Sequence, residues 1–235
     1  MERLLEGVRI LDLTQALSGP YCCMHLADQG ADVIKIEPPG GDMTRIWAPV
    51  VNDYSGYYAY FNRNKKGITL DLKSEEGKEA LRDLIRKSDV IVENFKAGTF
   101  AKLGFTYESI KEINPKIIYA QLTGFGLSGP MSEKPCYDIV AQAESGMMDM
   151  CGYPDGDPVK IGPSVADTFT GTYLALAIMM ALFRRTITGE GYHVDVAMLD
   201  TMFSTLEEGV IYKTLQNIDS TRAGNIHWSS LPWDL

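Results

Sequence analysis

An α/β fold with a doubly wound parallel sheet is predicted by three features of residues 1–126. Short apolar runs of strand length alternate with stretches that have a helical pattern. The first strand, helix and second strand follow one another within about thirty residues, the length of one βαβ unit. Each predicted strand ends near a loop of glycine, proline or polar residues. These features together indicate a Rossmann-like sheet with right-handed crossovers.

The predicted strands and helices alternate along this part of the chain. The helix over residues 74–88 has the clearest signals: a serine N-cap, glutamates in its first turn, basic residues at its end, and Leu81, Leu84 and Ile85 on one face. Strands are expected over residues 8–13, 31–37, 89–95 and 116–126, and helices over residues 21–30, 74–88 and 105–115.

The composition indicates a globular protein with a sizeable core. The chain has 235 residues, 45% of them hydrophobic, and a net charge of −9. Nucleic acid is not an expected partner, because phosphate binding needs an excess of lysine and arginine. The first residues lack a secretory signal, and the four cysteines fit neither a disulfide framework nor a metal-ligand spacing. We therefore expect a cytoplasmic protein with reduced thiols and no metal.

Asp167 precedes an uncharged, strongly apolar stretch over residues 168–183 that ends at Arg184 and Arg185. The stretch is shorter than the roughly 20 residues that cross a bilayer, so we expect a buried core helix and no membrane partner. An aspartate at the start of such a helix has two interpretations. It is either an N-cap that accepts backbone N–H groups, or a nucleophilic or acid–base carboxylate at the positive end of the helix dipole.

Ligands of doubly wound sheets bind beyond the carboxyl ends of the strands. The sequence places the loops 14–20, 37–45, 93–98 and 123–130 at those ends. Glu37 occupies the position where a dinucleotide enzyme binds a ribose. The loop 14–20 has only one glycine, however, whereas a bound pyrophosphate needs spaced glycines. A nicotinamide dehydrogenase is therefore disfavoured, and the scattered His25, His193 and His227 are interpreted as surface or packing residues.

Several sequence blocks occur in a distinctive order: GVRILDL, ADVIKIEPPGGDMTR, NKKGITLDLKSEEG, VENFKAG, NPKIIY, GFGLSGP and ADTFTG. In this order and spacing the chain resembles the class III CoA-transferases, which include formyl-CoA and carnitine CoA-transferases. The resemblance extends over nearly the whole chain. It implies transfer of CoA from an acyl-CoA donor to a small carboxylic acid, with Asp167 as the nucleophile that forms an aspartyl-CoA thioester.

The resemblance also implies where coenzyme A binds. Lys73, Lys96 and Lys102 are candidates for the nucleotide phosphates and Phe95 for the adenine, although such lysines are more commonly ordinary solvated charges. The implied CoA contacts are Leu17, Ser18, Leu70, Asp71, Leu72, Lys73, Asn94, Phe95, Lys96 and Lys102.

Three positions depart from formyl-CoA transferases: Leu17 replaces a glutamine, Pro38 an arginine and Pro135 a lysine. We therefore expect a substrate orientation different from that of the oxalate enzyme. A second relative on this fold is the α-methylacyl-CoA racemase, which uses a His/Asp pair. Its histidine corresponds to Tyr137, and a phenol with an ordinary pKa of about 10 is a poor base near neutral pH. Tyr137 thus favours a transferase and is a substrate-side candidate.

Two regions are predicted: a Rossmann-like large domain over residues 1–186 with the CoA site and Asp167, and residues 187–235 with a strand, a long helix and the start of a linker. The resemblance implies an interlocked homodimer whose small domain lies outside this sequence, so we expect a truncated chain with an apolar tail over residues 228–235. The alternatives are a racemase-like enzyme, or a non-catalytic CoA-binding fragment that needs a partner chain.

Overall fold

The structure is a computed structural model that describes residues 3–226. Its centre is a six-stranded parallel sheet in the order β5-β2-β1-β6-β7-β8, with all five strand pairings parallel. The sheet confirms the predicted fold class. Its strands are β1 (Arg9–Asp12), β2 (Asp32–Glu37), β5 (Lys66–Thr69), β6 (Val90–Glu93), β7 (Ile118–Thr123) and β8 (His193–Ala197).

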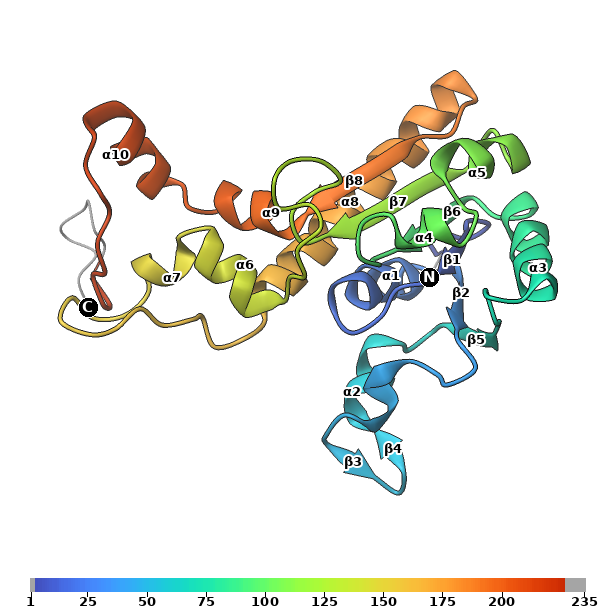
Figure 1. The fold of residues 1–235 in the computed structure, drawn as a ribbon, viewed down its shortest axis with the longest axis horizontal. Coiled ribbons are helices and arrows are strands. Elements are labelled where there is room, and N and C mark those ends of the chain that lie inside the picture. Colours follow the sequence, from blue (N-terminus) through green and yellow to red (C-terminus); the bar gives the residue numbers. More distant parts are fainter. Residues whose placement is uncertain (1–2, 227–235) are drawn as a thin grey trace.

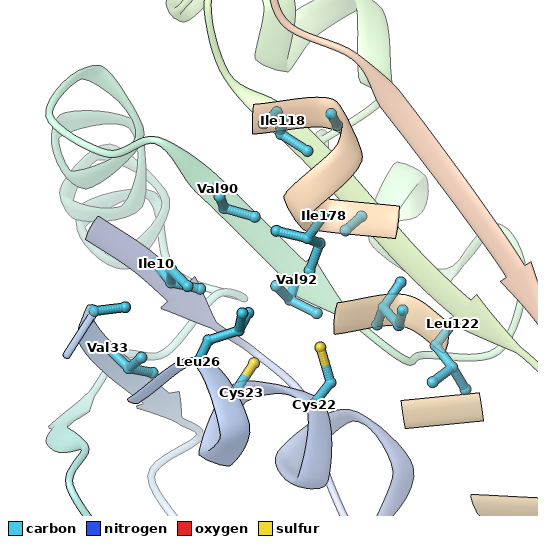
Figure 2. Packing of buried hydrophobic residues seen from close by; sticks show 14 of the residues in the cluster. Ile10, Cys22, Cys23, Leu26, Val33, Val90, Val92, Ile118, Leu122 and Ile178 are labelled. Atoms are coloured by element: carbon cyan, nitrogen blue, oxygen red, sulfur yellow. The ribbon is translucent and has the colours of Figure 1, made fainter. Parts of the chain in front are cut away.

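Helices cover both faces of this sheet (Figure 1). Alternation along the strands explains the two layers, because neighbouring residues such as Ile10 and Leu11 point to opposite faces. One face packs against α1 (Ser18–Asp28) and α8 (Val165–Thr188), and the other against α3 (Glu75–Arg86), α4 (Thr99–Lys102) and α5 (Tyr107–Ile113). In Figure 2, Cys22, Cys23 and Leu26 of α1 and Ile178 of α8 pack against the strands on the first face.

The remaining elements lie outside these layers. Between β2 and β5 the chain forms η1 (Met43–Ile46), the antiparallel pair β3 (Val50–Val51) and β4 (Tyr54–Ser55), and α2 (Gly56–Phe61). This excursion projects from one side of the sheet (Figure 1). The chain between β7 and α8 forms α6 (Asp138–Glu144) and α7 (Met147–Met150), and α9 (Met198–Ser204) and α10 (Glu208–Gln216) follow β8.

Two features differ from the sequence prediction. The edge strand β5 was not predicted, because its only apolar side chain is Ile68. The long helix expected after β8 is broken into α9 and α10, with Glu207 at a positive φ of 29° between them. The predicted boundary at residue 186 falls within α8, and β8 pairs with β7 in the same sheet. The division into two regions remains a prediction.

Helix α8 has 24 residues, longer than the uncharged stretch suggested, and by length and composition it could cross a membrane. The length argument against a membrane span is therefore wrong. Its most apolar 18-residue window has a mean hydropathy of 1.5 and is 39% buried. Leu174 and Ile178 of α8 lie in the core beside α1 and the sheet, which is the environment of a core helix. His227 and the apolar tail over residues 228–235 lie outside the described residues.

Candidate active site

The sheet reverses its strand order between β1 and β6, and the loops that follow these two strands meet there. The backbone N–H of Gln15 donates to Asn94 Oδ1 over 2.8 Å, and Asn94 Nδ2 donates to the carbonyl oxygen of Gln15 over 2.9 Å. These reciprocal bonds hold the two loops together. Such a switch point is where open α/β sheets bind ligands.

A cavity of about 280 Å³ opens at this point, and it brings together six predicted site residues. Two of the six lie in helices, Ser18 in α1 and Asp167 in α8, and the other four lie in loops. The six are Ser18, Asn94, Phe95, Lys96, Tyr137 and Asp167. The side-chain amide of Asn94 is already bonded to Gln15, so its observed role is to hold the neighbouring loop.

A second cavity of about 160 Å³ adjoins the first, and Gln15 and Phe95 line both. Four predicted CoA contacts from the segment after β5 line it: Leu70, Asp71, Leu72 and Lys73. Leu17 and Lys102 line neither of these two cavities. Leu17 is 7% exposed in the core before α1, and Lys102 lies on the surface at the end of α4.

Asp167 is the third residue of α8, and Ser164 is the N-cap. The capping interpretation of Asp167 is therefore wrong. A different carboxylate bonds to the first turn of the helix: Asp138 Oδ1 accepts the backbone N–H of Ala166 over 2.8 Å. The other oxygen, Asp138 Oδ2, accepts Gln142 Nε2 over 2.7 Å. Asp138 thus takes one N–H group of the first turn, and the carboxylate of Asp167 lines the cavity.

Burial, reinforced by the negative charge of Asp138, raises the pKa of Asp167 to about 7. Ser18 lines the same cavity, and hydrogen bonding by its side chain and backbone opposes this rise in the pKa of Asp167. Near neutral pH the protonated and the ionised forms are both populated.

Two further titratable groups lie near Asp167, and sequence reasoning missed both. Burial and the charge of Asp167 raise the pKa of the Cys136 thiol to about 11 and that of the Tyr57 phenol to about 12. Cys136 lines the larger cavity beside Tyr137. At neutral pH both groups are therefore neutral, and each can donate a hydrogen bond.

Two small residues let the walls of this site approach each other. A Cβ built on Gly171 of α8 would lie 2.5 Å from the carbonyl oxygen of Ser18 in α1. A Cβ on Gly124, after β7, would lie 2.1 Å from the Cβ of Cys136. Distances below 3.0 Å are essentially never seen for a real Cβ, so only glycine fits at either position.

Glu37 is not free to bind a ribose. Although burial opposes its ionisation, hydrogen bonds from Arg45 and Tyr58 hold the pKa of Glu37 down at about 2. Arg45 donates to both carboxylate oxygens over 2.7 Å, and the Tyr58 hydroxyl donates over 2.5 Å. The Arg45 guanidinium also stacks on the Tyr58 ring, 4.0 Å from its centroid. This cluster anchors the excursion between β2 and β5.

Neither His25 nor His193 lines the cavity that contains Asp167. Residues 3–226 contain no group of three or more histidine, cysteine or acidic side chains that could hold a metal ion. His25 packs edge-on against Tyr21, and His193 stacks against both Tyr107 and Tyr119. The cavity instead combines the Asp167 carboxylate with the exposed cations Lys96 and Lys134. That combination suits nucleophilic chemistry on anionic substrates.

The family model described as CoA-transferase family III matches residues 5–235. The chain is 45% identical to the succinyl-CoA:mesaconate CoA-transferase of Haloarcula hispanica, with 98% of this chain and 60% of that protein covered. It is 46% identical to the formyl-CoA:oxalate CoA-transferase of Streptomyces coelicolor, over 83% of this chain and 48% of that protein. The chain thus spans about half to three fifths of the length of these relatives.

A solved structure, that of a CAIB/BAIF family protein from Brucella suis, superposes with a TM-score of 0.94 at 42% sequence identity. The superposition covers 99% of this chain and 63% of that one. The described fold is therefore shared over essentially the whole of this sequence.

Proposed function

The chain belongs to CoA-transferase family III, and we propose that it carries the nucleophile and part of the CoA site of an enzyme that moves CoA between carboxylic acids. Asp167 is the proposed nucleophile. The observation that carries this proposal is the position of its carboxylate, which lines the cavity at the sheet switch point together with Ser18. A carboxylate can attack a thioester, because the thioester carbonyl is activated.

In the proposed reaction, the ionised Asp167 attacks the thioester carbonyl of acyl-CoA and expels the CoA thiolate, leaving a mixed anhydride. The thiolate then attacks the Asp167 carbonyl and releases the donor acid, which leaves an aspartyl-CoA thioester. The acceptor carboxylate attacks this thioester and expels CoA again. The thiolate finally attacks the acceptor carbonyl of the new anhydride, which releases the new acyl-CoA and regenerates Asp167.

Ser18, the burial of Asp167 and Tyr137 assist these steps in the proposal. The N–H and hydroxyl of Ser18 are donors for the negative charge that develops beside Asp167, as in an oxyanion hole. Burial of Asp167 gives it a pKa of about 7 and hence more nucleophilic character than an ordinary carboxylate. Tyr137, 64% exposed at the cavity, is the proposed contact for the acyl group.

The larger cavity is proposed to hold the thioester end of CoA, and the smaller cavity a more distant part of the same molecule. Gln15 and Phe95 lie at the junction of the two. Lys96 opens onto the first cavity and Lys73 onto the second, so each can pair with a phosphate. Lys102 remains a prediction, as does the homodimer.

Dicarboxylic acids are the proposed substrates. The names of the two relatives specify succinyl-CoA and mesaconate for one and formyl-CoA and oxalate for the other, and of these four only the formyl group does not derive from a dicarboxylic acid. Lys134 provides positive charge in the cavity that contains Asp167, where a second carboxylate of the substrate needs a cation. The different substrate orientation predicted from Leu17, Pro38 and Pro135 is a reason to test acids longer than oxalate.

An exchange assay tests this function. The protein is mixed with succinyl-CoA and a panel of oxalate, mesaconate, glutarate and acetate, and new acyl-CoAs are separated by chromatography. We expect a new CoA thioester with at least one dicarboxylic acid, and its loss in Asp167→Asn. Asp155→Asn, a substitution at an exposed loop aspartate, is the matched control and should keep the activity. Wild-type exchange rates in Asp167→Asn would refute the role of this carboxylate.

The racemase-like alternative makes a distinct prediction in the same assay. A racemase exchanges the α-proton of a 2-methylacyl-CoA with solvent deuterium and makes no new thioester. Neither His25 nor His193 lines the cavity, so among the described residues no histidine there can remove an α-proton. Deuterium incorporation without CoA exchange would favour the racemase.

A further inference from the structure

Four buried charges form a cluster that bonds to the loop leading to Ser18, and the proposed reaction does not use them. Asp12 and Lys65 form an ion pair of 2.8 Å whose side chains are 0% and 2% exposed. Lys35 and Asp42 form a second pair of 3.0 Å, and both side chains are 1% exposed. Buried ion pairs contribute little net stability, so a cluster of two suggests another role.

The two lysines also bond to the backbone on either side of Ser18. Lys35 Nζ donates to the carbonyl oxygen of Thr14 over 2.7 Å. Lys65 Nζ donates to the carbonyl oxygen of Pro20 over 3.0 Å. Asp12 completes the arrangement, because its Oδ1 accepts both the backbone N–H and the hydroxyl of Thr14. The chain is thus fixed four residues before Ser18 and two residues after it.

The segment between these two points is held in a strained conformation. Ala16 has a φ of 62°, in the left-handed region that residues with a side chain rarely adopt. Strain of this kind persists only where the surroundings over-determine the backbone, and it is concentrated at functional sites. Here the hydrogen bonds between Gln15 and Asn94 and those from Lys35 and Lys65 hold the backbone in this conformation.

We propose that Lys65 and Lys35, with their partners Asp12 and Asp42, are positioning residues that fix the first turn of α1 so that the N–H and hydroxyl of Ser18 point at Asp167. Lys65 contributes through Pro20 within the helix, and Lys35 through Thr14 before it. Neither lysine lines either cavity, so neither contacts the bound substrate. The inference rests on the proposed function, in which Ser18 assists Asp167.

The carboxyl titration of Asp167 tests this inference without any need for activity. It is followed by ¹³C NMR on protein labelled at aspartate, with the Asp167 signal assigned by its loss in Asp167→Asn. Because the Ser18 bonds favour the ionised form, Lys65→Met should raise the pKa of Asp167 by about one pH unit. The titratable groups that face Asp167, namely Asp138, Tyr57 and Cys136, are unchanged by the substitution.

Two further variants distinguish a loss of positioning by Lys65 from a change in net charge and from a loss of folding. Asp12→Asn/Lys65→Met removes both members of the ion pair, keeps the net charge and avoids an unpaired buried carboxylate. It should raise the pKa of Asp167 as the single substitution does. Lys66→Met is the matched control, because Lys66 is the next residue, is 73% exposed and pairs with Asp32 at the sheet edge. It should leave the titration unchanged.

A double-mutant cycle then assigns the effect to Ser18. In Ser18→Ala the hydroxyl bond is already absent, so adding Lys65→Met should raise the pKa of Asp167 by less than it does alone. An unchanged Asp167 titration in the folded charge-balanced variant, or the same rise with and without the Ser18 hydroxyl, would overturn the inference. Failure of the wild-type protein to exchange CoA would instead count against the proposed function, and the titration would still be measurable.

Discussion

Gly171 of α8 faces the carbonyl oxygen of Ser18 in α1 so closely that a Cβ at residue 171 would lie 2.5 Å from that oxygen. The same hypothetical carbon would lie 3.2 Å from the ring of Tyr21 and 3.3 Å from the backbone nitrogen of Cys22. Ser18 and Asp167 belong to these two helices, so the close approach at Gly171 sets their separation. The glycine one turn after Asp167 in α8 is therefore part of the active-site geometry.

Gly171→Ala tests this relationship. Alanine in a helix interior normally stabilises a protein by about 1 kcal/mol relative to glycine. Here we expect the opposite sign, a loss of about 1 to 3 kcal/mol, because α1 must move away from α8. We also expect slower CoA exchange, since Ser18 is displaced. Gly67→Ala is the control, as a Cβ at Gly67 meets nothing within 4 Å. Urea unfolding and the exchange rate measure the two effects, and a stabilised, fully active Gly171→Ala protein would contradict the account.

Asp138 should control the pH dependence of the reaction. Its negative charge is one cause of the raised pKa of Asp167, so Asp138→Asn should lower that pKa below about 7. The ionised carboxylate is the proposed nucleophile, and the acidic limb of the rate profile should therefore move to lower pH. Asparagine keeps an Oδ1 acceptor for the N–H of Ala166. The substitution therefore removes the negative charge of residue 138 but keeps its contact with α8. An acidic limb at the wild-type pH in Asp138→Asn would exclude this electrostatic role.

Asp167 should lower the stability of the folded protein at neutral pH. Its pKa is raised from 3.8 to about 7, so between these values the folded state holds more protons than the unfolded state. Stability from this group is therefore lost as pH rises from about 4 to about 7. Asp167→Asn cannot ionise, and it should be more stable than wild type by a margin that grows over this range to on the order of 4 kcal/mol.

Urea unfolding at a series of pH values checks this margin. Asp155→Asn, at the exposed loop position, should show no such pH-dependent gain. A margin between Asp167→Asn and wild type that stays constant from pH 4 to pH 8 would show that the carboxylate is not perturbed in the folded state.

Lys96 should contribute to CoA affinity through charge. The protein has a net charge of −9, so an anionic ligand depends on local cations. Lys96→Ala should weaken CoA binding by roughly fivefold, or about 1 kcal/mol, and should reduce its salt dependence. Lys111→Ala on α5 is the control, since Lys111 lines neither cavity. Calorimetry at two salt concentrations measures both quantities, and equal affinities for Lys96→Ala and wild type would exclude the contact.

The sequence contained enough information for the main strands and for Asp167, because buried strands and the apolar stretch of α8 have local signatures. It did not predict β5, whose stability comes from pairing with β2 rather than from its own apolar residues. Nor did it indicate the left-handed conformation at Ala16, since alanine carries no preference for positive φ.

The surroundings of Asp167 were less predictable than Asp167 itself. The sequence around Tyr137 did not indicate a role for Asp138. Its carboxylate reaches the N–H of Ala166 only through the packing of α6 against α8. No sequence pattern predicted that Cys136 lines the cavity. Its contact with Gly124 is a signal for that position, since only glycine fits there. Contacts between distant segments depend on tertiary packing, and a single sequence does not specify them locally.

Nucleophilic catalysis by Asp167 is tested most directly by intact-protein mass spectrometry after mixing the protein with succinyl-CoA, followed by peptide mapping. We expect a covalent succinyl or CoA adduct on the peptide that contains Asp167, and no adduct in Asp167→Asn. A folded wild-type protein that binds CoA but forms no adduct with any acyl-CoA of a panel would contradict nucleophilic catalysis by this chain. That result would leave a CoA-binding chain that depends on a partner for catalysis.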